Sequence, residues 1–364
     1  MAVIDNKELA AAQPRDLVGQ TFLVTGGSGF FGDFFIGQVL RRGAQVVNVD
    51  IVDAVREDGG LTNLRVDIRD HAALASAFRS RARIDAVFHF AALLAHGDIT
   101  DADMLSVNVQ GTRNVLDLCS AHGVPRLVFT STNCLWGGPV GHAIDESLPA
   151  KPCEAYGEAK LRAEELLLAD HRVVCAVIRT PTIIQAGRLG LLAILFEFID
   201  EGRKVWAVGG GRNRYQFIAA RDLAEAALLA RQIEKTELFN VGSDAVPSLR
   251  ETYEYVIRRA GTSARVATLP TWLALPLMRL THALHISPLG PYHRRMIAED
   301  FEFDTTKARR MLGWRPTLGN NEILAEAFEY YRSNKRAIQA RSGASAHRSA
   351  TPMGAAIRLL KWLS

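Results

Sequence analysis

Residues 21–32 read T-F-L-V-T-G-G-S-G-F-F-G, and this stretch decides the fold. Its first five residues form a short apolar run with β-branched side chains, which is typical of a buried strand. A glycine-rich turn follows at once, and apolar residues at 34–36, 39 and 40 then recur with helical spacing. The stretch therefore predicts a strand, a tight turn and a helix, the unit that opens a dinucleotide-binding fold.

The residues of this turn are candidates for binding a dinucleotide. Gly26 permits the turn, Gly29 lets backbone amides approach a pyrophosphate, and Gly32 allows the helix to pack closely on the strand. Phe30 and Phe31 open the expected helix, whose N-terminus carries the positive end of the dipole and attracts phosphate.

An acidic residue, Asp50, ends the next predicted strand. At this distance beyond the turn, roughly 20 residues, a carboxylate accepts hydrogen bonds from the adenosine ribose hydroxyls. A 2′-phosphate would meet its negative charge, and no arginine follows immediately. Asp50 therefore favours NAD as the cofactor and leaves NADP open, while the alternative is an ordinary turn residue at a strand end.

Tyr156 and Lys160 form a Y-x-x-x-K pair. Residues with this spacing lie on one face of a helix, about one turn apart. A lysine ammonium favours the phenolate and lowers the tyrosine pKa from its usual value of about 10, so Tyr156 is a candidate general acid or base. The same pair occurs on many solvated helices, and its weight here comes from the glycine turn.

Five motifs follow one another along the chain. They are TGGSGFFG at 25–32, DIRD at 67–70, HFAA at 89–92, NVQGT at 108–112 and YGEAK at 156–160. Together with DTTKARRMLGWRP at 304–316, they resemble the extended short-chain dehydrogenase/reductases, the NAD-dependent epimerase/dehydratase family, with likeness to its steroid and lipid 3-keto/3-hydroxy members. The resemblance covers residues 20–332.

The resemblance implies further site residues. Asp67 and Ile68 would flank the adenine, and Ala91 would lie along the phosphate–ribose path of the cofactor. Family members are commonly homodimers, so a homodimer is expected.

The resemblance also implies catalytic roles. Thr132, with Ser131 beside it, would hydrogen-bond the substrate oxygen, Tyr156 would transfer the proton, and Lys160 would bind the nicotinamide ribose and tune Tyr156. The hydride would pass between the nicotinamide and the substrate carbon.

Strand and helix patterns alternate up to about residue 182, which predicts an α/β fold with a Rossmann-type, doubly wound parallel sheet. The predicted strands are 21–25, 45–49, 63–66, 86–90, 126–131 and 173–179. The expected parts are an N-terminal extension at 1–18, a dinucleotide-binding domain at 19–182 plus 216–241, a smaller substrate lobe at 183–215 plus 242–332, and a basic tail at 333–364. Residues 215–222 and 237–240 are expected to return to the main sheet.

Departures from the family pattern concern the substrate. Nucleotide-sugar members usually carry an asparagine where this chain has Thr182, and an arginine where it has Tyr215. Arg214 is one position away, which on a strand reverses the face; Arg188 and Arg212 stay open as replacements. These changes favour a substrate other than a nucleotide sugar.

The stretch Thr132–Cys134 differs from the Thr-Asp-Glu of the sugar 4,6-dehydratases, which makes that elimination improbable. Cys134 is expected to be buried and inert, with a catalytic role as the alternative. The spacing of the four cysteines is not that of metal ligands, so a metal site is not expected. A reducing cytoplasmic compartment is expected instead of a disulfide framework. The start of the chain lacks the pattern of a signal peptide.

Two apolar stretches, 189–196 and 269–286, fall in the expected substrate lobe. They are either ordinary core helices or parts of a hydrophobic substrate tunnel or of a lid that lies on a bilayer. Residues 335–364 carry six Lys or Arg and no acid, whereas the whole chain has a net charge of +4. We interpret 335–352 as a mobile linker and 353–363 as an interfacial anchor on anionic lipid; a disordered tail or a helix on a partner subunit is the alternative.

The sequence thus predicts an NAD(P)-dependent oxidoreductase that interconverts a ketone and a secondary alcohol on a largely apolar small molecule, and a lipid such as a 3-keto sphingolipid or a sterol-like molecule would fit. It would be cytoplasmic, free or peripheral on the inner face of the membrane. The alternatives are a nucleotide-sugar 4-epimerase with bound NAD and a non-catalytic NAD-binding sensor. Nucleic-acid binding is not expected, because the basic residues are sparse.

Overall fold

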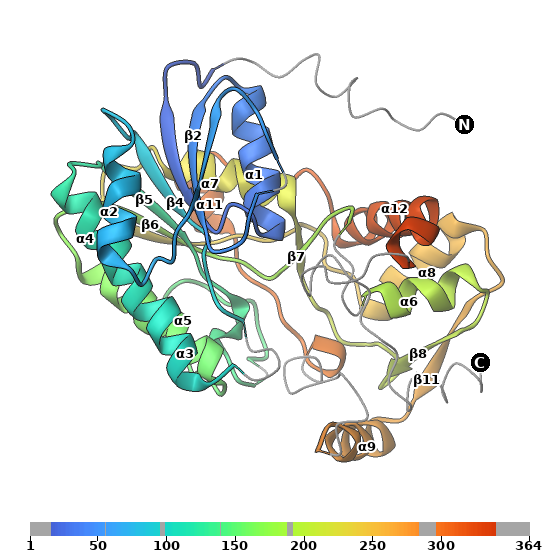
Figure 1. Ribbon diagram of the computed structural model, residues 1–364. Helices are drawn as coiled ribbons and strands as arrows, with labels where there is room; N and C mark the ends of the chain where they lie inside the picture. Colours follow the sequence, from blue (N-terminus) through green and yellow to red (C-terminus); the bar gives the residue numbers. More distant parts are fainter. Residues whose placement is uncertain are drawn as a thin grey trace.

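The computed structural model describes residues 16–339 except 55, 95–98, 139, 188–191 and 284–295. A parallel seven-stranded sheet with the order β10-β6-β5-β4-β1-β2-β3 forms its centre (Figure 1). The strands are β1 (Thr21–Thr25), β2 (Gln45–Asp50), β3 (Leu61–Arg65), β4 (Ala86–His89), β5 (Arg126–Thr130), β6 (Val174–Arg179) and β10 (Glu237–Asn240). The predicted α/β class and the six predicted strands are confirmed.

Helices cover both faces of this sheet (Figure 1). One face carries α1 (Phe30–Arg41), α7 (Ala220–Ala230) and α11 (Thr306–Leu312), and the other carries α2 (His71–Arg79), α4 (Thr112–Ala121) and α5 (Ala155–Ala169). Phe22 and Val24 of β1 join the first core, and Leu23 joins the second. Successive side chains of a strand point to opposite faces, which is why a doubly covered strand reads as a continuous apolar run.

One of the two predicted returns to the main sheet is wrong. β10 adds to the edge of β6, as expected. Phe217–Ala219 (β9) instead pairs with β7 (Thr182–Ile184) in a separate two-stranded sheet. The physical reason is that β10 already occupies the outer edge of β6, so β9 pairs with the segment that continues beyond β6.

The smaller lobe has its own apolar core, which includes Phe196, Phe328 and Tyr331. Its elements are α6 (Leu192–Asp200), β8 (Lys204–Val208), α8 (Leu249–Ala260), β11 (Arg265–Leu269), α9 (Thr271–Ala283) and α12 (Asn320–Gln339). Core packing is confirmed for the described part of 189–196, since Phe196 is fully buried. It is wrong for α9, where the side chain of Trp272 is 77% exposed.

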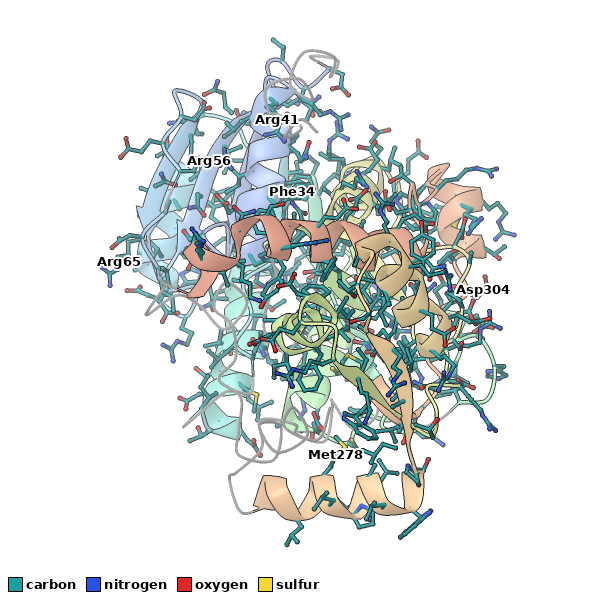
Figure 2. All side chains as sticks on the ribbon, turned by 90° about the vertical axis from the view of Figure 1, so that its right-hand side faces the viewer. Phe34, Arg41, Arg56, Arg65, Met278 and Asp304 are labelled. Atoms are coloured by element: carbon teal, nitrogen blue, oxygen red, sulfur yellow. The ribbon has the colours of Figure 1, made fainter. Side chains whose placement is uncertain are left out.

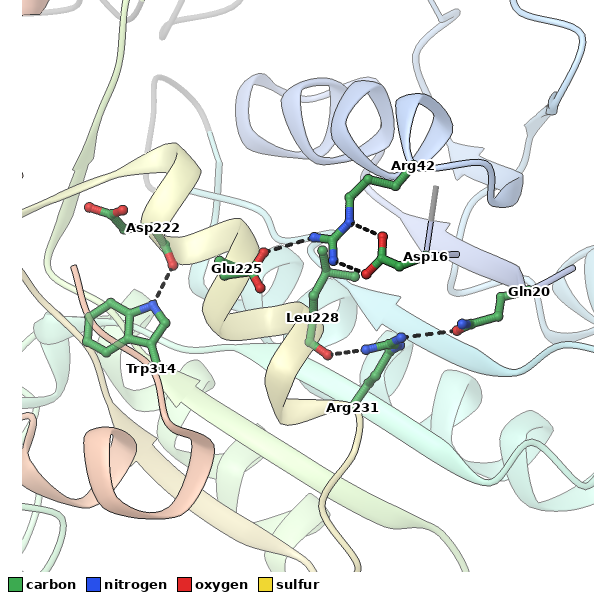
Figure 3. Close-up of polar contacts among 8 residues, drawn as sticks. All are labelled: Asp16, Gln20, Arg42, Asp222, Glu225, Leu228, Arg231 and Trp314. Atoms are coloured by element: carbon green, nitrogen blue, oxygen red, sulfur yellow. Dashed lines mark hydrogen bonds and ion pairs between the residues drawn. The ribbon is translucent and has the colours of Figure 1, made fainter. Parts of the chain in front are cut away.

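Helix α7 ties several parts of the chain together (Figure 3). Arg42, just after α1, donates hydrogen bonds to Glu225 of α7 at 2.9 Å and to Asp16 at 2.5 Å. Trp314 is fully buried, and its indole N–H donates to the Asp222 carbonyl at 2.8 Å. The late motif at 304–316 therefore returns the chain from the smaller lobe to the main core.

The predicted linker at 335–352 begins too early, because α12 continues to Gln339. Lys335 Nζ lies 2.6 Å from Asp200 Oδ2, and Ile338 is buried against the core of the smaller lobe, so packing extends the helix. The rest of the tail, with the proposed anchor at 353–363, lies outside the described residues. No helix within the described ranges is long and apolar enough to cross a membrane.

Candidate active site

The glycine turn lies at the carboxyl edge of the sheet, directly after β1. Gly26 has a positive φ of 72°, and a Cβ there would lie 2.5 Å from the amide nitrogen of Ala91. A Cβ at Gly32 would overlap the Gly26 carbonyl oxygen. The structure thus brings Gly26, Gly32 and Ala91 together at backbone distance, where a side chain has no room.

The N-terminus of α1 faces this turn. Gly29 is the N-cap residue and has no side chain with which to cap the helix. The ring of Phe31 is buried and lies against Phe90, with ring centroids 4.8 Å apart. The side chain of Phe31 is therefore part of the core, and its contribution to binding a phosphate at the helix N-terminus is limited to its backbone.

Asp50 lies at the end of β2 beside the same turn. Its carboxylate accepts hydrogen bonds from the backbone N–H of Ser28 at 2.9 Å and of Val52 at 3.0 Å. Asp50 thus joins the glycine turn to the loop after β2. This contact agrees with both alternatives, since the carboxylate supports the turn and also lies beside the place expected for a ribose.

The predicted adenine residues lie at the next strand end. Asp67 pairs with Arg69 at 2.6 Å, and this hydrogen bond lowers the pKa of the Asp67 carboxyl. Ile68 is buried, and a Cβ added at Gly111 would lie only 2.5 Å from the Ile68 side chain, so the two residues are in close contact. Gly111 ends a π-helical turn, η1 (Ser106–Gly111), a feature that is frequent at functional sites.

Asn108 of this π-helical turn is a positioning residue that the sequence analysis did not single out. Its side chain accepts from Leu93 N at 2.7 Å and donates to Leu93 O at 2.9 Å. It therefore holds the segment that follows Ala91. The NVQGT motif contained this residue, but no local pattern indicates which loop an asparagine will hold.

His89 is a second such residue, buried below the glycine turn. Its Nδ1 lies 2.6 Å from Thr25 Oγ1, and its Nε2 lies 2.9 Å from Thr112 Oγ1. Burial, and the positive charge of Lys160 to a smaller degree, lower the pKa of His89 to about 3. The imidazole is therefore neutral at pH 7 and links β1, β4 and α4.

Lys160 is buried on α5. Its Nζ donates a hydrogen bond to the carbonyl oxygen of Thr130 at 2.6 Å and lies 3.9 Å from the centroid of the Phe129 ring. Burial lowers the pKa of Lys160 to about 7, although the Glu164 carboxylate, one turn along α5, opposes this shift. The ammonium is thus held at the end of β5.

Thr132 and Tyr156 lie in two segments that are in contact. Thr132 caps the short turn η2 (Asn133–Leu135), and its Oγ1 accepts from Cys134 N at 3.1 Å. Tyr156 is half-buried in the first turn of α5. A Cβ at the next residue, Gly157, would overlap the Cys134 carbonyl oxygen, so α5 begins directly against η2. The three predicted catalytic residues therefore gather where β5 ends.

Three residues that depart from the family pattern form one polar cluster beside this site. Asn133 Nδ2 donates to the Tyr215 hydroxyl at 2.6 Å, and Thr182 Oγ1 lies 3.3 Å from the same oxygen. Arg214 faces the other way, as predicted, and its Nε donates to the Val246 carbonyl at 2.7 Å. It borders a separate, open cavity of about 500 Å³ that Arg212 also lines; Arg188 lies outside the described residues.

The prediction that Cys134 is buried is wrong. It is half-buried, because it lines a small cavity of about 20 Å³ together with Asn133, Trp136 and Tyr215. None of the four cysteines, all within the described residues, forms a disulfide, and Cys153 is exposed. The described part of the chain contains no cluster of three His, Cys, Asp or Glu side chains that could hold a metal ion.

Comparisons with known proteins find relatives and solved structures that match most of this chain. An uncharacterized protein, y4nG, of Sinorhizobium fredii is 34% identical over 334 residues, which cover 91% of this chain and 83% of the relative. Short-chain dehydrogenase/reductase family 42E member 1 of Danio rerio is 29% identical over 343 residues, or 85% and 88% of the two chains. The crystal structure of UDP-glucose 4-epimerase with UDP-glucose from Thermotoga maritima has a TM-score of 0.72, with 23% identity and coverage of 87% and 100%.

A family model described as "NAD dependent epimerase/dehydratase family" matches residues 22–242. The match confirms the predicted family, its class as an enzyme and NAD as its cofactor, and the solved neighbours confirm the Rossmann-type fold. The chain is a member of the NAD-dependent epimerase/dehydratase family, within the extended short-chain dehydrogenase/reductases.

Proposed function

We propose that this enzyme interconverts a ketone and a secondary alcohol on a largely apolar substrate, with lipids of the 3-keto sphingolipid or sterol-like kind as the expected class. The observation that carries the proposal is the contact of the Tyr215 hydroxyl with Asn133 and Thr182. Tyr215 and Thr182 stand where nucleotide-sugar members of the family are expected to carry an arginine and an asparagine. Here the hydroxyl groups of Thr182 and Tyr215 are hydrogen-bonded to one another, and neither position carries a positive charge that could bind a diphosphate.

The surroundings of Tyr215 support an apolar substrate. Tyr215, Trp136, Phe301 and Phe303 form a chain of ring contacts with centroid distances of 4.9 to 6.4 Å. Three of these rings, those of Tyr215, Trp136 and Phe301, line the small cavity beside Cys134. Asn133, Glu299 and Asp300 also line this cavity, and at about 20 Å³ it is smaller than a ligand pocket, so the support comes from the cluster of aromatic rings itself.

The glycine turn fits a dinucleotide. Gly26, Gly29 and Gly32 leave a backbone-lined cradle that side chains would fill, and Asp50 lies beside it. We propose that this turn, with Asp67, Ile68 and Ala91, holds NAD, and NADP stays an alternative. When bound, the dinucleotide supplies or accepts the hydride.

We assign the proton chemistry to three residues. During oxidation, the Tyr156 phenolate would take the proton of the substrate hydroxyl as its carbon loses a hydride; reduction reverses both transfers. The Thr132 hydroxyl would hydrogen-bond the reacting oxygen. Lys160 would favour the phenolate through its charge and would bind the nicotinamide ribose.

The test is turnover by purified protein with NAD⁺ or NADP⁺ on a panel of long-chain and sterol-like secondary alcohols, with UDP-glucose and UDP-galactose in parallel. The proposal expects NAD⁺-dependent oxidation of an apolar alcohol and its loss in Tyr156→Phe, which should still bind NAD⁺. Turnover of UDP-sugars alone, or full activity of Tyr156→Phe, would overturn it.

A nucleotide-sugar 4-epimerase is the second candidate, favoured by the similarity to the epimerase of Thermotoga maritima. The two candidates differ in what Thr182→Asn with Tyr215→Arg should do. If the substrate is apolar, this double variant loses activity and gains affinity for UDP. If it is a nucleotide sugar, the wild type already binds UDP tightly, which calorimetry will detect.

We also propose, from the sequence of the tail, that residues 353–363 lie on the anionic inner face of a membrane, and that the chain forms a homodimer in a reducing cytoplasmic compartment. Cys119 and Cys175 support the last point, because both thiols are buried in the core and neither forms a disulfide. Vesicle binding with and without residues 340–364, and light scattering of the purified protein, test the first two.

A further inference from the structure

Helix α9 turns an apolar face away from the protein. Its inner residues Ala274 and Met278 are buried, and Figure 2 shows Met278 on the side toward the body of the molecule. The exposed fractions on the other side are 77% for Trp272, 44% for Leu273, 48% for Leu277 and 57% for Leu280, with exposed Pro276 between them. Helical spacing places these five residues on one side, the α9 outer face.

The part of the lobe that carries this face is basic. β8 pairs with β11, which leads directly into α9, and the three elements lie together at the foot of the smaller lobe (Figure 1). Residues 202–215 and 255–283 include these elements and contain eight Lys or Arg but no Asp or Glu. Arg203 pairs with Glu201, just before the first range, and Arg214 and Arg259 pair with Glu302 and Glu329. Arg279 is exposed and lies on α9 itself.

We propose that the α9 outer face docks on the surface of an anionic lipid bilayer. A short helix with tryptophan and leucine on one side, and with Arg279 at the margin of that side, suits the boundary between head groups and acyl chains. Cations near an anionic leaflet are attracted to it.

Charge selects this occupant over a second copy of the chain. A twofold dimer through α9 would bring together two surfaces on which cations outnumber the acids that pair with them, and like charges repel. The role of this docking rests on the proposed function, because an apolar substrate would dissolve in the bilayer and docking would bring the enzyme to it. Met296, which lines the cavity beside Cys134, lies shortly after α9 in the chain.

Co-sedimentation of the full-length protein with vesicles tests the docking. Vesicles of phosphatidylcholine and phosphatidylglycerol in equal parts should bind the protein, and vesicles of phosphatidylcholine alone should bind it more weakly. Trp272→Ser with Leu280→Ser should weaken binding to the anionic vesicles by at least about 10-fold, since two large apolar side chains lose their burial. High salt should weaken the wild type as well.

The matched control is Val18→Ser with Met311→Ser, which removes two exposed apolar side chains elsewhere and should bind as the wild type does. All variants are exposed-site changes and should keep the wild-type circular dichroism. Equal binding by the α9 variant and the wild type, both with and without residues 340–364, overturns the proposal. The proposal is also overturned if the wild type does not bind vesicles but forms a dimer in light scattering, and the α9 variant does not form this dimer.

A parallel assay separates this proposal from the proposed function. Tyr156→Phe should bind vesicles as the wild type does, and the α9 variant should turn over a short, water-soluble alcohol at the wild-type rate. If neither the wild type nor the α9 variant turns over an alcohol but the wild type still binds vesicles, the proposed function is wrong and the docking surface is supported.

Discussion

Lys160 Nζ donates a 2.6 Å hydrogen bond to the backbone carbonyl of Thr130, so the ammonium on α5 is tied to the end of β5. Because this lysine is buried, its pKa falls to about 7 in the folded chain. The unfolded value is near 10.4. The charge that would tune Tyr156 is thus held in place by the fold and is close to its titration point at neutral pH.

Lys160→Met should move the pH profile of alcohol oxidation. Without the ammonium, the Tyr156 phenolate is disfavoured, so the acidic limb of kcat/KM should shift upward by about 1 to 3 pH units. Initial rates between pH 6 and 10 measure the shift. An unchanged limb with only a lower kcat would assign Lys160 to cofactor binding alone.

Gly157→Ala should lower kcat by about 100-fold, because the added Cβ overlaps the Cys134 carbonyl and displaces the first turn of α5 from η2. Thermal unfolding should show that the variant folds. Gly59→Ala is the control, since a Cβ there meets no atom within 4 Å and should leave kcat unchanged. Wild-type kcat in Gly157→Ala would mean that the spacing of Tyr156 and Thr132 is not critical.

Arg179→Met should reduce the free energy of unfolding by about 3 to 5 kcal/mol. Arg179 and Glu164 form a buried ion pair at 2.7 Å, and removal of the guanidinium leaves a carboxylate in the core. Arg179→Met with Glu164→Leu should recover most of the loss, because neither partner of the ion pair is left without the other. Urea titrations measure both, and a double variant less stable than the single one would contradict this explanation.

His89 should make stability depend on pH in the acid range. Its pKa is about 3 when folded and about 6.5 when unfolded, so the unfolded chain binds the extra proton between these values. The free energy of unfolding should therefore fall as pH drops from 6.5 to 3, with a contribution from His89 of about 1.4 kcal/mol per pH unit.

His89→Leu should be less stable at pH 7, because the Thr25 hydroxyl loses its bond to the ring, but its acid slope should be flatter by that amount. His171→Gln, at an exposed position, should keep the wild-type slope. Urea titrations at pH 7, 6 and 5 compare the three proteins. Parallel slopes for His89→Leu and the wild type would show that His89 titrates normally.

The sequence by itself determined the features that depend on neighbouring residues. The apolar run Thr21–Thr25, the glycines after it and the acid Asp50 place constraints on one short stretch of backbone, and the structure realises each of them. The Y-x-x-x-K spacing likewise fixed that Tyr156 and Lys160 share a face of α5. Local sterics and side-chain periodicity are sufficient for such predictions.

Only the tertiary structure decided what depends on distant partners. The pairing of β9 with β7 follows from the edge that β10 occupies, and no local pattern records this. The buried ring of Phe31, the contact of Asn133 with Tyr215, and the exposed face of α9 arise in the same way. The polarity of a side chain determines whether burial or contact with water is favourable for it. Which surface or partner it contacts is determined only by the folded chain.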